Sequence, residues 1–299
     1  GELETGGRTL TLSASIGIAV SESGSTAAEL LQEATTALHR AKELGRNRWS
    51  FADPERGIES ARRLALEAEI RAGLETGEFV PWFQPIVLLA DDSLAGYEAL
   101  ARWQNNGQIR EPAEFLDVLV HSQWVSDLDH AIVEPSVATL AKQSDHLFVS
   151  INVTGVTLTN TDYAAHVREC LDTYGVDPRR LHIEVTETML LNLDEPVLDQ
   201  MGDLASLGVR WYVDDFGTGY SAISHLRDMP VSGLKLDRSF TEGIRSGDAT
   251  ARQLANGLVG LANGLALDTV AEGIETRAEA DYLRTLGWRH GQGWLFGKA

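Results

Sequence analysis

Trp211-Tyr212-Val213-Asp214-Asp215 reads as an apolar strand that ends in two adjacent acids. The pattern recurs in His182-Ile183-Glu184-Val185-Thr186-Glu187, and charged residues also alternate with apolar ones in Leu234-Lys235-Leu236-Asp237. Charges buried beside a core are costly unless they are paired or hold a metal. One or two such acids fit structural salt bridges, but a series at successive strand ends indicates a shared site.

Predicted strands alternate with predicted helices over most of the chain. One helix is expected to begin near Asp194, and another is expected to begin with a capping box of Thr276 and Glu279. The alternation predicts an α/β fold, a modified (β/α)8 TIM-like barrel, with a doubly wound open sheet as the alternative. The predicted strands are Val80–Val87, Leu94–Trp103, Leu147–Val153, Leu181–Thr186, Val209–Asp214, Gly233–Asp237, Leu267–Glu272 and His290–Phe296.

The first two of these strands are separated only by Leu88 to Ser93. This connection is too short for a crossover helix, so we expect the two strands to pair antiparallel. The barrel is therefore predicted to be irregular near its start.

The N-terminal part has a separate pattern. Apolar residues alternate from Thr9 to Val20, which predicts one strand, and a helix opened by Thr26 and Glu29 is expected to follow and to end at Gly45. One strand and one helix cannot close a core, so this part is expected to be a short βα fragment of a domain.

Three segments follow from this division. Residues 1–53 are the expected fragment, and residues 54–63, which contain Pro54 and Gly57, are the expected linker. Residues 64–299 are the expected barrel domain.

The composition limits the partners and the compartment. There are 44 acidic and 25 basic residues, a net charge of -19, which disfavours duplex nucleic acid as a partner. The single cysteine, Cys170, fits a reducing, cytoplasmic setting. No apolar run reaches about 18 residues, so no membrane contact is expected from this chain. Because it begins at Gly1, we expect a piece of a longer protein, which could be membrane-anchored upstream.

The polar residues suit a hard divalent metal. Carboxylates with an amide oxygen favour Mg²⁺ or Mn²⁺, and zinc is disfavoured because no histidine pair has ligand spacing. The adjacent Asp214 and Asp215 could serve one or two ions, as in two-metal phosphoryl hydrolysis. Lys235 would add a positive charge, and Glu272 is a candidate general base.

Several motifs in order resemble one family. Glu98-Ala99-Leu100 is followed by DDFGTGYSA from Asp214, LKLDRSF from Leu234, AEGIET from Ala271 and GQGWLFGK from Gly291. Residues from about Leu64 onward resemble an EAL domain, the family that hydrolyses cyclic di-GMP to linear pGpG in bacterial signalling with magnesium or manganese. One departure is Trp294, where the family frequently has tyrosine.

The resemblance implies a role for each matching residue. The implied metal ligands are Glu98, Asn152, Glu184, Asp214 and Asp215. The implied catalytic residues are Lys235, Glu272 and Glu187, the last as the anchor of the loop after Asp215. The implied substrate-binding residues are Gln84, Leu100, Arg102, Asp237, Glu275 and Gln292, with Arg102 pairing with a phosphate.

Residues 1–53 resemble the C-terminal third of a GGDEF domain, the module that makes cyclic di-GMP, through Thr9–Val20 and Ala41–Asn47. The loop that names that family is absent, so no cyclase activity is expected.

Two other functions stay open. A catalytically silent cyclic di-GMP receptor is the first alternative, although no implied metal ligand is missing. A barrel enzyme that abstracts a proton beside a carboxylate is the second, and the adjacent acids fit it poorly. Homodimerisation is compatible with the family, but the sequence indicates no interface.

Overall fold

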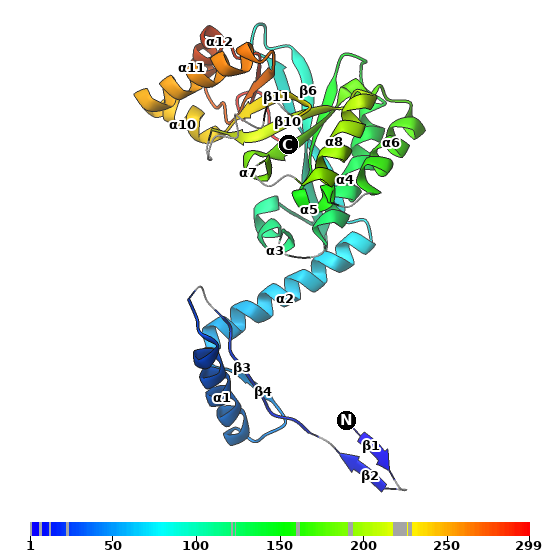
Figure 1. Cartoon of the computed structure of the whole chain (residues 1–299), viewed down its shortest axis with the longest axis vertical. Coiled ribbons are helices and arrows are strands. Elements are labelled where there is room, and N and C mark those ends of the chain that lie inside the picture. Colours follow the sequence, from blue (N-terminus) through cyan, green and yellow to red (C-terminus); the bar gives the residue numbers. More distant parts are fainter. Residues whose placement is uncertain are drawn as a thin grey trace. The chain divides into compact units, whose positions relative to one another are not determined.

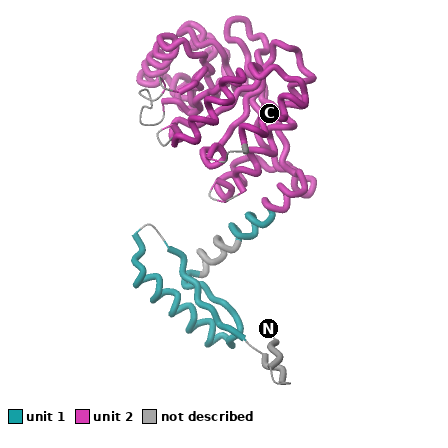
Figure 2. Tube along the Cα trace, turned by 45° about the vertical axis from the view of Figure 1, so that its right-hand side comes forward, with its two compact units in different colours: residues 1–69 teal, residues 70–299 magenta. Residues whose placement is uncertain are grey.

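The computed structural model describes residues 2–5, 8–11, 13–21, 24–120, 122, 124–159, 162–190, 194–217, 226 and 229–299. The chain divides into two compact units, residues 1–69 and 70–299 (Figure 2). Among the described residues, no helix combines the length and the apolar character needed to cross a membrane.

A closed mixed barrel forms the second unit, with helices around its outside (Figure 1). The sheet order is β5-β13-β12-β11-β10-β9-β8-β6-β7, and an additional β5–β6 pairing closes the ring. The predicted barrel is confirmed, and the open sheet is excluded. The strands are β5 (Phe79–Leu88), β6 (Leu94–Asn105), β7 (Gln108–Arg110), β8 (Phe148–Asn152), β9 (Leu181–Thr186), β10 (Arg210–Phe216), β11 (Val231–Leu236), β12 (Asp268–Ala271) and β13 (His290–Gln292).

The irregular strand of the barrel is β5, which pairs antiparallel with both β6 and β13. The predicted antiparallel start is therefore confirmed. The other barrel pairings are parallel. Strand β7 was not predicted, and it extends β6 as an antiparallel hairpin outside the ring.

The last strand is shorter than the predicted His290–Phe296. It stops at Gln292, and the next residue, Gly293, has a φ of +154°. A Cβ at Gly293 would lie 2.1 Å from the carbonyl oxygen of Ile274, so only glycine allows the chain to pass so close.

The helix signals read from the sequence are confirmed. Helix α8 has Asp194 at its N-cap, and α12 begins with the reciprocal capping box of Thr276 and Glu279. Within the described residues, the α-helices of this unit, apart from α2 at the boundary, are α3 (Leu116–Leu119), α4 (Val125–Leu140), α5 (Gly155–Leu158), α6 (Asp162–Tyr174), α7 (Glu187–Leu190), α8 (Glu195–Leu207), α10 (Arg238–Ser246), α11 (Ala249–Gly264) and α12 (Arg277–Leu286).

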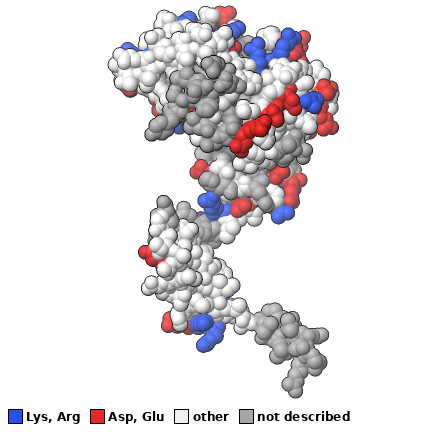
Figure 3. Space-filling model, in the orientation of Figure 1, with Lys and Arg blue, Asp and Glu red and all other residues white. Residues whose placement is uncertain are grey.

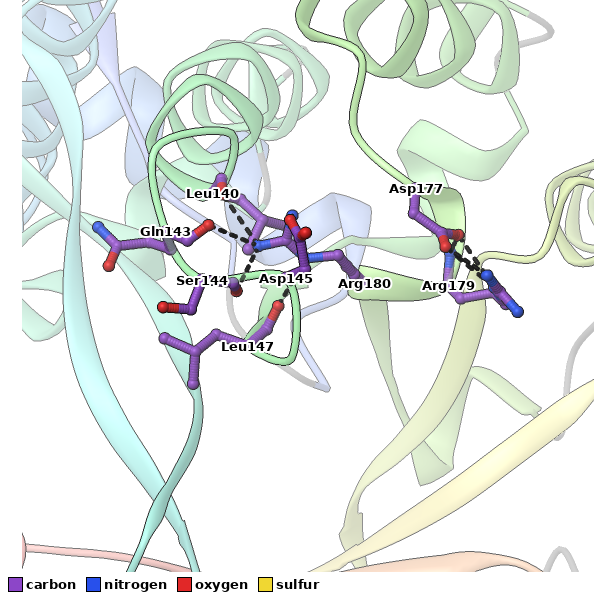
Figure 4. Close-up of polar contacts among 8 residues, drawn as sticks. All are labelled: Leu140, Gln143, Ser144, Asp145, Leu147, Asp177, Arg179 and Arg180. Carbon is purple, nitrogen blue, oxygen red and sulfur yellow. Dashed lines mark hydrogen bonds and ion pairs between the residues drawn. The ribbon is translucent and has the colours of Figure 1, made fainter.

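Arg180 fixes the end of α4 against the start of the sheet. Its guanidinium donates to the carbonyl oxygens of Leu140 at 3.1 Å, Ser144 at 2.9 Å and Leu147 at 2.8 Å (Figure 4). These three carbonyls belong to the last residue of α4 and to the turn that leads from it into β8. Because β9 starts directly after Arg180, this contact helps to position the strand that carries Glu184.

The N-terminal ends of the strands are filled by aromatic side chains. The ring of His182 stacks between Phe148 and Tyr212, at centroid distances of 4.0 and 4.7 Å. Burial lowers the pKa of His182 to about 3, so the ring is neutral. His182 therefore packs at the barrel end opposite the acids.

The first unit contains α1 (Ala27–Glu43), with the predicted Thr26–Glu29 capping box. The single strand expected over Thr9–Val20 is wrong, because β2 (Arg8–Thr11) and β3 (Ile16–Ile18) are separate strands. β2 pairs with β1 (Glu2–Thr5) and β3 with β4 (Trp49–Phe51). The segment 54–63, expected as a linker, lies within the helix α2 (Pro54–Glu75).

Candidate active site

Lys235 lies at the centre of the site, buried on β11. Its Nζ lies 2.6 Å from Glu184 Oε2, 2.6 Å from Glu272 Oε1, 3.2 Å from Glu98 Oε2 and 3.4 Å from Asp214 Oδ1. Burial by itself would lower the pKa of Lys235, but these four carboxylates hold it well above its ordinary value. The ammonium is charged, and the ionised carboxylates would exceed it by three negative charges.

Two amide side chains fix Glu98. Asn152 donates to Glu98 Oε1 at 2.8 Å, and Gln292 donates to Oε2 at 2.7 Å. Burial favours the protonated acid, but the charge of Lys235 and these hydrogen bonds outweigh it and lower the pKa of Glu98. Glu98 is thus held as a carboxylate.

The pKa of Glu184 shifts in the opposite direction to that of Glu98, although both side chains contact Lys235. Burial and the nearby charge of Glu98 raise the pKa of Glu184 well above its ordinary value. Ser150 donates to its other oxygen, Oε1. The site therefore holds more carboxylates than one ammonium can neutralise, and an additional cation would relieve that excess.

Asp214, Asp215 and Glu272 form a group that suits such a cation. One carboxylate oxygen from each lies within 4.8 Å of the others. Asp214 Oδ1 is buried and has no hydrogen-bond donor among the residues that the structure describes, although Lys235 lies nearby. These are hard oxygen donors of the kind that Mg²⁺ and Mn²⁺ prefer.

The two adjacent aspartates have different backbone conformations. Asp215 has a φ of +54°, and the β10–β11 register shifts between Val213 and Phe216. Burial and then the charge of Asp214 raise the pKa of Asp215 to about 6, and burial raises that of Glu272 to about 8. The raised pKa values of Asp215 and Glu272 show that the positive charge nearby does not neutralise this cluster of carboxylates.

Glu187, buried at the start of α7, accepts a hydrogen bond of 3.0 Å from the backbone N–H of Gly217. Gly217 lies two residues beyond Asp215. The rest of the glycine-containing motif, residues 218–222, lies outside the described residues.

A cavity of about 360 Å³ opens beside these acids. Gln84 lies in its wall, accepts a hydrogen bond of 2.9 Å from Gln292, and donates one of 3.2 Å to the carbonyl of Gly297. The expected site residues that line the cavity are Gln84, Glu98, Leu100, Asp214, Glu272, Glu275 and Gln292. The expected residues that do not line it are Arg102, Asn152, Glu184, Glu187, Asp215, Lys235 and Asp237.

Arg102 and Asp237 already have contacts within the protein. The Arg102 guanidinium lies 5.7 Å from the ring centroid of Trp82, and its Nη1 donates to the carbonyl oxygen of Ala101 at 3.0 Å. Asp237 is the N-cap of α10 and accepts from the backbone N–H of Ser239 at 3.1 Å.

Glu275 lies in the cavity wall, and Arg245 from α10 pairs with it. Arg245 also contacts Glu279 at 3.1 Å, so it joins the loop after β12 to α12.

Sequence reasoning missed other residues of the site. Ser150 precedes Asn152 by two positions on β8, and that period-2 spacing would have identified it. Arg238 and Glu242 line the cavity from α10, and Trp294 lines it from beyond β13. No strand-end pattern marks these three.

Known families match both parts of the chain. The EAL domain model matches residues 67–299, and the model of the diguanylate cyclase GGDEF domain matches residues 2–48. The chain belongs to the EAL domain family and carries the C-terminal fragment of a GGDEF domain before it.

Among curated proteins, the chain is 33% identical to the cyclic di-GMP phosphodiesterase NbdA of Pseudomonas aeruginosa, over 98% of the chain and 38% of the relative. It is 30% identical to the cyclic di-GMP phosphodiesterase PdeR of Escherichia coli, over 96% of the chain and 44% of the relative. The chain thus spans less than half of these relatives.

Solved structures of EAL proteins also match the fold of this chain. The EAL enzyme Bd1971, bound to cAMP and cyclic di-GMP, matches with a TM-score of 0.78 and 30% identity, over 92% of this chain and 73% of that one. The MucR phosphodiesterase in complex with c-di-GMP matches with a TM-score of 0.73 and 28% identity, over 78% and 96%.

Proposed function

We propose that this chain hydrolyses cyclic di-GMP to linear pGpG with Mg²⁺ or Mn²⁺, as a cyclic-guanylate-specific phosphodiesterase of bacterial signalling. The observation that carries the proposal is the convergence of four carboxylates on the buried Lys235 beside an open cavity. The names of the relatives support cyclic di-GMP as the substrate. A silent receptor would not need this set of charged residues.

The metal would be held by the carboxylates and the amide at the barrel mouth. When bound, one or two such ions would polarise the phosphoryl group and neutralise charge that develops on it. The residues that would hold them are Glu98, Asn152, Glu184, Asp214 and Asp215.

The remaining charged residues would orient the attacking water and accept its proton. Lys235 carries a fixed positive charge beneath the cavity and would help to orient the attacking water. Glu272 lies in the wall beside it and would accept a proton from that water. Glu187 would keep Asp215 in place by binding Gly217.

The substrate would occupy the cavity between β5 and the segment after β13. Gln84, Leu100, Glu275 and Gln292 line this space and would contact it. We propose that Arg102 leaves its packing on Trp82 to pair with a phosphate. Asp237 would act on the substrate-binding part of the site indirectly, because as the N-cap it fixes the start of α10.

The domain limits and cellular setting are part of the proposal. Residues 64–299 would form the catalytic domain, and residues 1–53 would lack cyclase activity. We expect a cytoplasmic setting and no duplex nucleic acid as a partner. A homodimer of this chain is compatible with the proposed function. The large acid excess is consistent with this, and Figure 3 shows acidic side chains gathered on the viewed face of the barrel unit.

Chromatography of the products, with calorimetry beside it, tests this function. Purified chain with cyclic di-GMP and Mg²⁺ should give pGpG as the first product, and the same amount of cyclic di-AMP should be cleaved far more slowly. Binding of cyclic di-GMP without any product would instead support the receptor.

A further inference from the structure

Asp129 on α4 is a buried acid that has no part in the site described so far. Its side chain belongs to a residue that is only 8% exposed, and it does not line the cavity. Helix α4, on the outside of the barrel, is in contact with the short helix α5 (Figure 1). A buried carboxylate is costly unless donors satisfy it, so the donors that reach Asp129 indicate what it does.

Three hydrogen bonds converge on one oxygen of Asp129, Oδ2. Thr154 donates to it twice, through its backbone N–H at 2.9 Å and through Oγ1 at 2.8 Å. Thr157 Oγ1 donates to the same oxygen at 2.5 Å. Asp129 thus ties α4 to the turn that leads from β8 into α5.

Thr154 directs its hydroxyl to α4 instead of to its own helix. It is the N-cap of α5, a position where a threonine side chain usually accepts from a backbone N–H of the first helical turn. Here the side chain makes no capping hydrogen bond to the described backbone of α5. The contact with Asp129 therefore replaces the local cap, which indicates that the tie to α4 matters for this turn.

This turn begins directly after Asn152, the last residue of β8. The pairing of β8 with β9 ends where Asn152 lies opposite Glu184, and the N–H of Val153 then donates to the Glu184 carbonyl at 3.0 Å. Thr154 is the next residue, and Asp129 is its anchor. Asn152 is thus held from two sides, by β9 through the strand pairing and by α4 through Thr154.

The position of Asn152 matters because its amide has two tasks. Its Nδ2 donates to Glu98 Oε1 at 2.8 Å, which leaves Oδ1 as the atom that a metal could use. A binding group has to be held within about 0.5 Å of its productive position by the residues that support it. Side chains that only orient a ligand change metal affinity by about 10–100-fold when they are replaced.

We propose that Asp129 is a positioning residue that holds Asn152 in place for a divalent metal ion, through its hydrogen bonds to Thr154. The inference rests on the proposed function, because that function supplies the metal. Asp129 and Thr154 do not line the cavity, so their loss should act on the metal and not on contacts with the substrate.

Mn²⁺ titration without substrate tests this role, with the free ion followed by electron paramagnetic resonance. The ion of interest is the one whose binding is lost in Glu98→Gln. Asp129→Ala should raise its Kd by about 10-fold or more, and Asp129→Asn, which keeps an oxygen acceptor, should stay within about 3-fold of the unmodified chain. KM for cyclic di-GMP at saturating Mn²⁺ should change by less than about 3-fold. An unchanged Kd in Asp129→Ala would overturn the proposal.

Thr154 provides a second test that leaves Asp129 in place. Thr154→Val removes the hydroxyl at nearly constant shape and should raise the Kd for Mn²⁺ by about 5-fold, because the backbone bond remains. Thr154→Ser keeps the hydroxyl and should bind as the unmodified chain does. Thr139→Val is the matched control, because Thr139 Oγ1 on the same helix donates to the carbonyl of Pro135. Equal Kd values in Thr154→Val and Thr154→Ser would contradict the hydroxyl's role.

Asp268→Asn separates positioning from a general loss of stability. Asp268 is also a largely buried acid, with a side chain that is 9% exposed, but it begins β12 at the opposite end of the barrel. Its replacement should lower the free energy of unfolding in urea and leave the Kd for Mn²⁺ unchanged. If Kd rises equally for equal losses of stability in Asp268→Asn and Asp129→Ala, Asp129 has only a structural role.

The outcomes for the unmodified chain separate this inference from the proposed function. If it binds Mn²⁺ but does not cleave cyclic di-GMP, the function fails and the comparison of Kd values still decides the role of Asp129. If it binds and cleaves, and the variants bind Mn²⁺ equally well, only the role of Asp129 fails. If Glu98→Gln loses no bound Mn²⁺, the metal assignment and the role of Asp129 fail together.

Discussion

Lys235 Nζ on β11 lies 2.6 Å from Glu184 Oε2 on β9, although β10 lies between these two strands in the sheet. The contact crosses the inside of the barrel, where the side chains of non-neighbouring strands meet. This lysine therefore ties together carboxylates from several strands, and the predictions below depend on that arrangement.

Lys235→Ala should lower kcat by about 100-fold or more, because it removes the positive charge and the donor that would orient the attacking water. KM should change by less than about 3-fold, since Lys235 does not line the cavity. Steady-state kinetics at saturating Mg²⁺ measures both. A large rise in KM with little change in kcat would make Lys235 a substrate-binding residue instead.

Glu98→Gln should weaken metal binding, because it removes a charged ligand while the side-chain volume stays nearly constant. Even outer-shell partners of metal sites change metal affinity or activity by about 10–100-fold, so removal of a charged ligand should cost at least about 100-fold in activity. The test is a titration of activity with Mg²⁺. Glu75→Gln is the matched control, because the Glu75 side chain is 63% exposed and pairs with Arg71 on the surface. Full activity of Glu98→Gln would mean that Glu98 is not a ligand.

Asp268 should make the stability of the barrel depend on pH. Burial would raise its pKa, but hydrogen bonding and charge from His290, the charge of Arg289 and the amide of Thr269 outweigh this and lower the pKa to about 2. A lowered pKa stabilises the fold above the unfolded value of about 3.9, and this contribution of about 2 kcal/mol is lost as the pH falls toward 2.

Urea unfolding of the unmodified chain and of Asp268→Asn between pH 7 and pH 3 measures this contribution. The difference in free energy of unfolding should be largest above pH 5 and should shrink as the pH falls below 4. A difference that does not vary with pH would contradict the assigned pKa.

Cys170 should react slowly with alkylating reagents in the folded chain. Burial, and then the charges of Glu134 and Glu169, raise the pKa of its thiol to about 11. At pH 8 the thiolate is then scarce, so iodoacetamide should modify it about 100-fold more slowly than a free cysteine. Mass spectrometry can follow this directly, because the chain has one cysteine. Equal rates in the folded chain and in denaturant would show that Cys170 is accessible.

The sequence predicted those parts of the fold that depend on local patterns. Apolar alternation identified the barrel strands, and capping residues such as Asp194 and Thr276 marked helix starts, because both signals act within a few residues. The strand β7 and the pairing of β13 with β5 were missed, since strand pairing depends on contacts between distant segments. The early end of β13 depends on the approach of Gly293 to Ile274, which no local pattern encodes.

The candidate site was predicted to a similar extent. Acids at strand ends were identified because a parallel barrel brings those ends together. The sharing of one lysine by Glu98, Glu184, Asp214 and Glu272 was not predicted, because it depends on distances across the barrel. Trp294 was noticed only as a departure from the family, and its exposure in the cavity wall required the structure.

Removal and return of the metal test the central claim most directly. The purified chain should convert cyclic di-GMP to pGpG in Mg²⁺ or Mn²⁺, lose this activity in excess chelator, and regain it when either ion is restored. Undiminished pGpG production in chelator would contradict the account, because the acids around Lys235 would then have no metal to hold during catalysis.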